Sequence, residues 1–111
     1  MKITTKNITY PLTYKGEYED RVDIKLVKKN SELMKFAINY RAKILGKWRR
    51  VWRVDNAHGY IHKQELWRTK KPIPLKNFES WNMKDVFDYF FKDLEENCER
   101  YVRYYEEKLE R

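Results

Sequence analysis

The chain has 111 residues, of which 41% are hydrophobic and 38% are charged, and its formal net charge is +8. A chain of this length folds as one domain without internal staples, and its single cysteine, Cys98, excludes a disulfide framework within the monomer. No stretch approaches the roughly 18 apolar residues of a membrane span, so we expect a soluble, cytoplasmic protein with no membrane partner.

Alternating apolar residues predict strands in the first part of the chain. Ile8-Thr9-Tyr10 indicates a short edge strand, and residues 18–28 alternate apolar with charged side chains. The clearest strand covers residues 34–44, where every second residue is apolar. These residues are Met34, Phe36, Ile38, Tyr40, Ala42 and Ile44.

A glycine turn predicts that the next strand forms a hairpin with this one. Leu45-Gly46-Lys47 separates residues 34–44 from a strand over residues 48–56. Strict alternation puts Trp48, Arg50, Trp52, Val54 and Asn56 on one side of this strand and Arg49, Val51, Arg53 and Asp55 on the other. A further strand covers residues 60–67 and ends before the prolines at 72 and 74, which remove ladder donors. We expect four to five antiparallel strands within about residues 8–75.

The last third of the chain has the period of a helix. Apolar residues recur at steps of three and four from Met83 to Leu109, and Asn82 with Asp85 forms a capping sequence. The pattern predicts a long helix over about residues 82–110. The expected fold class is α+β, a twisted antiparallel sheet with this helix packed on one face, in a single domain spanning residues 1–111.

The predicted helix is longer than the strands on which it packs. At 1.5 Å per residue it extends about 40 Å, roughly twice an ordinary strand, so its end is expected to overhang the sheet. There, Tyr101, Tyr105 and Leu109 either form a homodimer contact or lie on a frayed terminus.

Positive charge is concentrated in the middle of the chain. Residues 33–76 contain twelve Lys or Arg and two Asp or Glu, with no acid between Leu33 and Val54. Arginine suits phosphate, and the interleaved Trp48 and Trp52 either stack on unpaired bases or face the core. The predicted nucleic-acid-binding residues are Arg41, Lys43, Lys47, Arg49, Arg50 and Lys63. We expect Arg41, Lys43, Arg49 and Arg53 to share one sheet face.

Both histidines lie in one short segment, residues 55–62. His62 and His58, with Asp55 and Arg53, supply the acid, base and cation that phosphodiester cleavage needs, and they form the candidate catalytic set. The alternative is structural: Asp55 and Asn56 start a turn in which Gly59 takes a positive φ. Two histidines and one aspartate make at most three ligands, so an open metal site fits these residues better than a closed zinc site. Neither a metal nor another cofactor is predicted.

The same part of the chain resembles the TumE family of small toxins from toxin–antitoxin pairs. The matching residues are Tyr40, Ala42, Gly46, Lys47, Arg53, Asp55, Asn56, Gly59 and His62. The chain departs from that family in reading His62-Lys63-Gln64 instead of placing a second histidine two residues later, and in having His58. The segment is also similar to a group of uncharacterised archaeal proteins with Asp-Asn-Ala-His-Gly. The TumE resemblance implies an α+β, cytoplasmic toxin-like protein, acting on RNA and neutralised by a DNA-binding partner, such as a helix-turn-helix antitoxin.

Three functional classes remain open from the sequence. The leading hypothesis is a toxin-like RNA-binding or RNA-acting protein, in the second case a ribonuclease, of a toxin–antitoxin or mobile-element system. The second is a non-catalytic adaptor whose basic face docks an acidic protein. The third is a DNA-binding accessory protein. Salt dependence separates nucleic-acid binding from hydrophobic docking, because phosphate contacts weaken steeply as salt rises.

Overall fold

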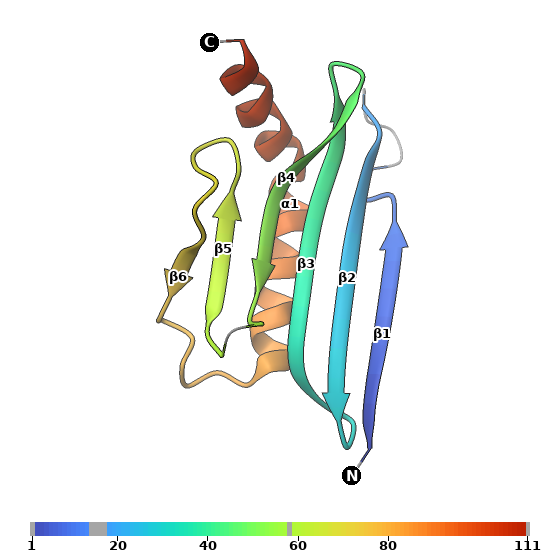
Figure 1. The fold of residues 1–111 in the computed structure, drawn as a ribbon, viewed down its shortest axis with the longest axis vertical. Helices are drawn as coiled ribbons and strands as arrows, with labels where there is room; N and C mark the ends of the chain where they lie inside the picture. Colours follow the sequence, from blue (N-terminus) through green and yellow to red (C-terminus); the bar gives the residue numbers. More distant parts are fainter. Residues whose placement is uncertain (1, 14–17, 58, 111) are drawn as a thin grey trace.

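A computed structural model describes residues 2–13, 18–57 and 59–110, and it shows an α+β fold in two layers (Figure 1). In these residues, six antiparallel strands form one sheet in sequence order, and one helix crosses a single face of it. The elements are β1 (Ile3–Tyr10), β2 (Asp20–Lys29), β3 (Glu32–Ile44), β4 (Lys47–Asp55), β5 (Ile61–Glu65), β6 (Ile73–Leu75) and α1 (Met83–Leu109).

The sheet has more strands than the predicted four to five. β1 starts at Ile3 and pairs with β2 along its whole length, although most of its residues are polar and exposed. Its pattern was weak because an edge strand far from the helix buries little. β6 contains Pro74, which pairs with His62. Proline is tolerated there because an edge strand needs ladder hydrogen bonds on only one side.

The core lies between α1 and the face of the sheet that α1 covers. Phe36, Ile38, Tyr40, Ala42 and Ile44 of β3 are buried there, which confirms the predicted alternation from Phe36 onward. Met34, the first residue of the predicted apolar series, is 44% exposed because the β2–β3 register shifts beside it. The buried residues of α1 are Val86, Phe90, Leu94, Cys98, Tyr101 and Val102. The helix begins after Asn82, whose side chain accepts a hydrogen bond from the Asp85 backbone N–H at 2.9 Å, as the capping sequence predicted.

A bulge changes the alternation halfway along β4. Tyr40 pairs with Trp52, but the next residue, Arg41, pairs with Arg50 instead of Val51. Trp52 therefore faces the core at 0% exposure, whereas Trp48 and Arg50 point to the opposite face. The strict alternation predicted for residues 48–56 is wrong before the bulge and correct after it.

The end of α1 does not leave Tyr101 exposed, contrary to the sequence-based expectation. Its ring stacks with Trp52 and with Trp67, at centroid distances of 6.1 and 5.0 Å. Its hydroxyl donates to Asp93 Oδ1 at 2.8 Å, and the residue is 5% exposed. The segment after β5 carries Trp67 onto the helix and covers the tyrosine. Tyr105 and Leu109 are half-buried against the same core.

The described chain offers no membrane-spanning helix. α1 is long, but neither it nor any other part of residues 2–13, 18–57 and 59–110 combines helical length with sufficient apolar character.

Candidate nucleic-acid interface

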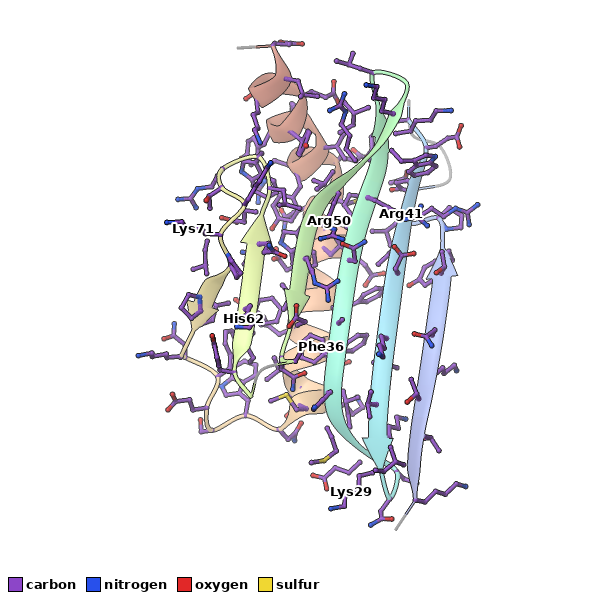
Figure 2. All side chains as sticks on the ribbon, viewed as in Figure 1. Lys29, Phe36, Arg41, Arg50, His62 and Lys71 are labelled. Atoms are coloured by element: carbon purple, nitrogen blue, oxygen red, sulfur yellow. The ribbon has the colours of Figure 1, made fainter. Side chains whose placement is uncertain are left out.

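The face of the sheet opposite α1, here called the open face, is strongly basic. Figure 2 looks onto it, with α1 behind the strands. Across residues 21–25, 35–43 and 50–55, pairing register and alternation place seven cations and two carboxylates on it, and Lys29 and Glu32 pair with each other on the same side at the β2–β3 hairpin end. The cations are Arg21, Lys25, Lys35, Arg41, Lys43, Arg50 and Arg53, and the carboxylates are Asp23 and Asp55.

Asp23 is fully engaged by its neighbours on the open face. Arg41 contacts it through Nε at 3.0 Å and Nη2 at 3.3 Å, Asn39 Nδ2 donates at 3.1 Å, and Thr9 Oγ1 donates at 3.0 Å. Burial alone raises the pKa of Asp23, but these donors outweigh it and hold the pKa below its ordinary value. The ionised carboxylate fixes Arg41 in one orientation.

Arg41 also lies over an exposed aromatic ring. Its guanidinium carbon is 5.2 Å from the centroid of Trp48, whose side chain is 42% exposed. The sequence left open whether Trp48 and Trp52 face bases or the core, and the structure separates them: Trp52 is buried and Trp48 lies on the open face. A cation stacked on an exposed indole is a surface on which a nucleobase can pack.

The remaining cations of the open face leave a large excess of positive charge. Arg21, Lys25, Lys35, Lys43 and Arg50 form no ion pair with any residue that the structure describes. Asp23 and Asp55, the carboxylates that lie among them, are already paired with arginine. The open face can therefore bind several anionic groups without displacing internal partners.

Asp55 and His62 face each other across β4 and β5 at the edge of the basic region. The His62 Nδ1 atom lies 3.5 Å from Asp55 Oδ1, and Arg53 Nε donates to Asp55 Oδ2 at 3.0 Å. Both Asp55 and His62 are 8% exposed, and the Tyr60 ring packs edge-on against the imidazole at 4.2 Å. The structure thus brings together three of the four predicted catalytic residues. His58, the fourth, lies outside the described residues.

Asp55 is held in its charged form. Burial raises its pKa, but the Ala57 backbone N–H, Arg53 and His62 together lower it below the ordinary value. A carboxylate ionised at neutral pH can orient the imidazole beside it. The arrangement can therefore place a proton-transferring group beside a cation.

The adjoining residues form a turn, as the structural alternative predicted. Asn56 Oδ1 accepts from the Phe36 backbone N–H at 2.9 Å, and its Nδ2 donates to the Met34 carbonyl at 3.0 Å. Its own carbonyl accepts from the Gly59 N–H at 3.1 Å, and Gly59 has a φ of +86°. Asn56 is thus occupied in closing the end of the β3–β4 hairpin.

The family comparison covers almost the entire chain. A model described as a domain of unknown function, DUF7718, matches residues 3–111. The chain belongs to the DUF7718 family. No curated protein and no solved structure matches it.

The DUF7718 match includes every strand and α1, so the open face and the Asp55–His62 pair belong to the family domain. Within the described residues, no group of three His, Cys, Asp or Glu side chains is placed to hold a metal ion.

The structure divides the six predicted nucleic-acid-binding residues between two sides of the sheet. Arg41, Lys43 and Arg50 lie on the open face. Arg49 pairs with Ala42 on the helix-covered side and donates to the Ile44 carbonyl at 3.1 Å. The expectation that it shares a face with Arg41 is wrong, because the bulge reverses its direction.

Lys47 and Lys63 also lie away from the open face. Lys47 pairs with Ile44 at the hairpin end, on the same side as the core, and its side chain is exposed. Lys63 pairs with Val54 and forms an ion pair with Glu65 at 3.3 Å.

β2 contributes residues that the sequence analysis did not select. Arg21, Asp23 and Lys25 alternate with buried Val22 and Ile24, and they lie beside the basic positions of β3. The alternation of these charged residues with apolar ones could have placed them on the solvent-facing side of a strand. They lie outside residues 33–76, where the excess of Lys and Arg in the sequence is largest, so the charge distribution did not point to them.

Proposed function

We propose that this protein binds single-stranded RNA on its open face, as a toxin-like, cytoplasmic component of a toxin–antitoxin or mobile-element system. The supporting observation is the charge arrangement: across the described residues 21–25, 35–43 and 50–55, seven cations face outward, and the two carboxylates among them, Asp23 and Asp55, are each paired with an arginine. Single strands suit such a surface because their bases can splay onto exposed aromatic rings while the backbone follows the cations.

Features of the molecule favour RNA over the other two partners. α1 belongs to a segment, residues 77–111, with ten acids against six bases, so it is poorly suited to enter a DNA groove. An acidic protein would contact the same cations, but its carboxylates would not stack on the indole of Trp48 beneath Arg41. Stacking of a base on this ring distinguishes a nucleic acid from a purely electrostatic partner.

The decisive experiment compares two double variants with equal loss of charge. Lys35→Gln/Lys43→Gln removes two cations from the open face, whereas Lys28→Gln/Lys47→Gln removes two exposed lysines directed to the other side. We expect only the first variant to weaken the binding of a single-stranded RNA, measured by fluorescence anisotropy. Circular dichroism checks that both variants fold.

The wild-type affinity should fall with salt with a log–log slope of roughly −3 to −4, as for four or five phosphate contacts on a single strand. The first double variant should reduce the magnitude of this slope by about 1.4. Absence of RNA binding at about 50 mM salt, or equal loss in both variants, would contradict the proposal. Tighter binding of duplex DNA would favour the DNA accessory function, and tighter binding of poly-glutamate would favour the adaptor.

Cleavage of the bound RNA is a second candidate, which the pairing of His62 with Asp55 beside Arg53 favours. Incubation of labelled RNA with the wild type and with His62→Gln tests it on a denaturing gel. Products formed by the wild type and lost in the variant, with unchanged RNA affinity, would support a ribonuclease. Intact RNA after incubation with the wild type would leave binding as the function.

The toxin role rests on the resemblance to TumE and is tested in cells. Expression of the wild-type protein should arrest growth, and Lys35→Gln/Lys43→Gln should relieve the arrest. Co-expression of a helix-turn-helix protein encoded beside the gene should also relieve it. Normal growth on expression of the wild type would contradict the toxin role while leaving RNA binding to be judged by the affinity measurements.

A further inference from the structure

A second basic feature lies where β4 and β5 separate. Pairing of these strands ends near Trp52 and Glu65, with a last hydrogen bond from the Leu66 N–H to the Val51 carbonyl at 3.1 Å. Beyond that point there is a notch of about 410 Å³ between β4, the segment after β5 and the end of α1. The residues that line the notch are Arg50, Gln64, Leu66, Lys70, Tyr105 and Lys108.

The described residues that line the notch include three cations and no acid. Arg50, Lys70 and Lys108 line it, and none of the three forms an ion pair with a residue of the described chain. Lys108 is half-buried, and its ammonium group donates to the Leu66 carbonyl at 2.9 Å and lies 5.3 Å from the centroid of the Tyr105 ring. Like charges gathered in one place repel one another, so an anion bound among them would be stabilised.

The segment that carries Lys70 is held in place. The N–H groups of Arg68 and Thr69 donate to the Glu65 carbonyl at 2.9 and 3.1 Å. Gln64 Nε2 donates to the carbonyl of Lys70 itself at 3.1 Å. A fixed backbone reduces the entropy lost when the lysine engages a ligand.

We propose that the notch binds a terminal phosphate monoester, at the end of an RNA strand that crosses the open face. The assignment rests on the proposed function. Arg50, which Figure 2 labels on the open face, also lines the notch and so connects the two sites. A monoester carries about two negative charges at neutral pH, whereas an internal phosphodiester carries one, so three cations favour the chain end. The volume of the notch lies within the range of roughly 300–1,000 Å³ of small-ligand pockets.

The test uses one short RNA sequence in three forms, with a phosphate at the 5′ end, at the 3′ end or at neither end. We expect one of the phosphorylated forms to bind the wild type roughly tenfold more tightly than the hydroxyl-ended form. Lys70→Gln and Lys108→Met should each remove most of this gain while changing the affinity for the hydroxyl-ended RNA by less than about threefold. Methionine retains the apolar contact of the Lys108 stem, and Lys70 is exposed, so the variants should fold.

Lys92→Gln is the matched control, because this exposed lysine of α1 lies outside both the open face and the notch and should keep the full gain. If the hydroxyl-ended RNA binds and its phosphorylated forms bind equally well, the notch assignment fails and the proposed function stands. If no form of the RNA binds, the proposed function fails, and the notch assignment fails with it. Calorimetry with inorganic phosphate tests whether the notch binds free phosphate instead of an RNA end. If phosphate binding releases heat that Lys70→Gln abolishes, and the wild type shows no preference among the RNA ends, the assignment to an RNA terminus is overturned.

Discussion

At the scale of single residues, buried polar side chains determine how the open face is built. Asp55 and Asn56 are neighbours in sequence but have different tasks. The Asp55 carboxylate pairs with a charged neighbour, Arg53. The Asn56 amide instead hydrogen-bonds backbone groups of β3, at the end of a hairpin. The two tasks predict different responses to substitution, one dependent on pH and one independent of it.

Asp55→Asn should lower the free energy of unfolding by about 1–2 kcal/mol at pH 7, because Arg53 and His62 lose their charged partner while the amide oxygen can still accept from Ala57. The pKa of Asp55 is lower in the folded than in the unfolded state. The contribution of the charged carboxylate to the free energy of unfolding is therefore complete above the unfolded pKa of about 3.9, and it disappears as the pH falls through the folded pKa. The difference between wild type and variant should therefore shrink towards pH 3, as measured by urea unfolding. An equal difference at pH 7 and pH 3 would disprove the charge-based account.

Asn56→Ala should destabilise the protein by about 1–3 kcal/mol at all pH values, because the Phe36 N–H and the Met34 carbonyl lose their partner. Asn56→Asp should be no better at neutral pH, since a carboxylate cannot donate to the Met34 carbonyl. Thermal unfolding measures both variants. A melting temperature unchanged in Asn56→Ala would show that water replaces the amide without loss.

At the scale of elements, the hairpin turns orient the strands of the open face. Leu45 and Gly46 join β3 to β4 with φ angles of +53° and +77°, a two-residue turn that matches the twist of the strands. Glycine adopts this conformation freely, but leucine does not. The turn therefore contains one favourable residue and one strained residue.

Leu45→Asn should stabilise the hairpin by about 0.5–1 kcal/mol, because asparagine tolerates the left-handed region and Leu45 is 76% exposed, so little burial is lost. Gly46→Ala should destabilise it by roughly 1 kcal/mol through backbone strain alone, since an added Cβ would meet no atom within 4 Å. Denaturant titration of both variants provides the measurement. Stabilisation by Gly46→Ala would contradict the assigned turn geometry.

At the scale of the whole molecule, the shape is elongated, with extents of 49 × 27 × 20 Å, and its two faces differ in chemistry. One face of the sheet is covered by α1 and forms the core. The other face presents cations from β2, β3 and β4. A long strand of nucleic acid can follow the open face without contacting the core, so binding variants and stability variants should be separable.

The homodimer predicted through the end of α1 is still a prediction, but Tyr101 cannot contribute because its own chain buries it. If Tyr105 and Leu109 pair with a second copy, Leu109→Glu should convert the dimer to a monomer in light scattering at high micromolar concentration. Tyr105 also lines the notch, so the mass should be measured with and without phosphorylated RNA. A monomeric wild type under both conditions would rule out this dimer.

The sequence by itself determined the kinds of element and their order. The period of two at residues 34–44 and the steps of three and four after Met83 are local signals, and they located the longest strand and the helix correctly. The charge count also identified the basic middle of the chain. The sequence predicted only the last three residues of β1 and did not predict β6, because edge strands bury few side chains, and burial is what produces the pattern.

Only the tertiary structure decided which charged side chains meet. Asp23 and Arg41 are 18 residues apart and contact each other because β2 and β3 pair in a particular register, which no local pattern reveals. No local pattern reveals the bulge beside Val51 either. Because of this bulge, Trp52 faces the core and Arg50 faces the open side. Side-chain direction in a sheet alternates with every residue, so a single inserted residue reverses the direction of all the residues that precede it on the strand. The composition of the open face depends on this inserted residue.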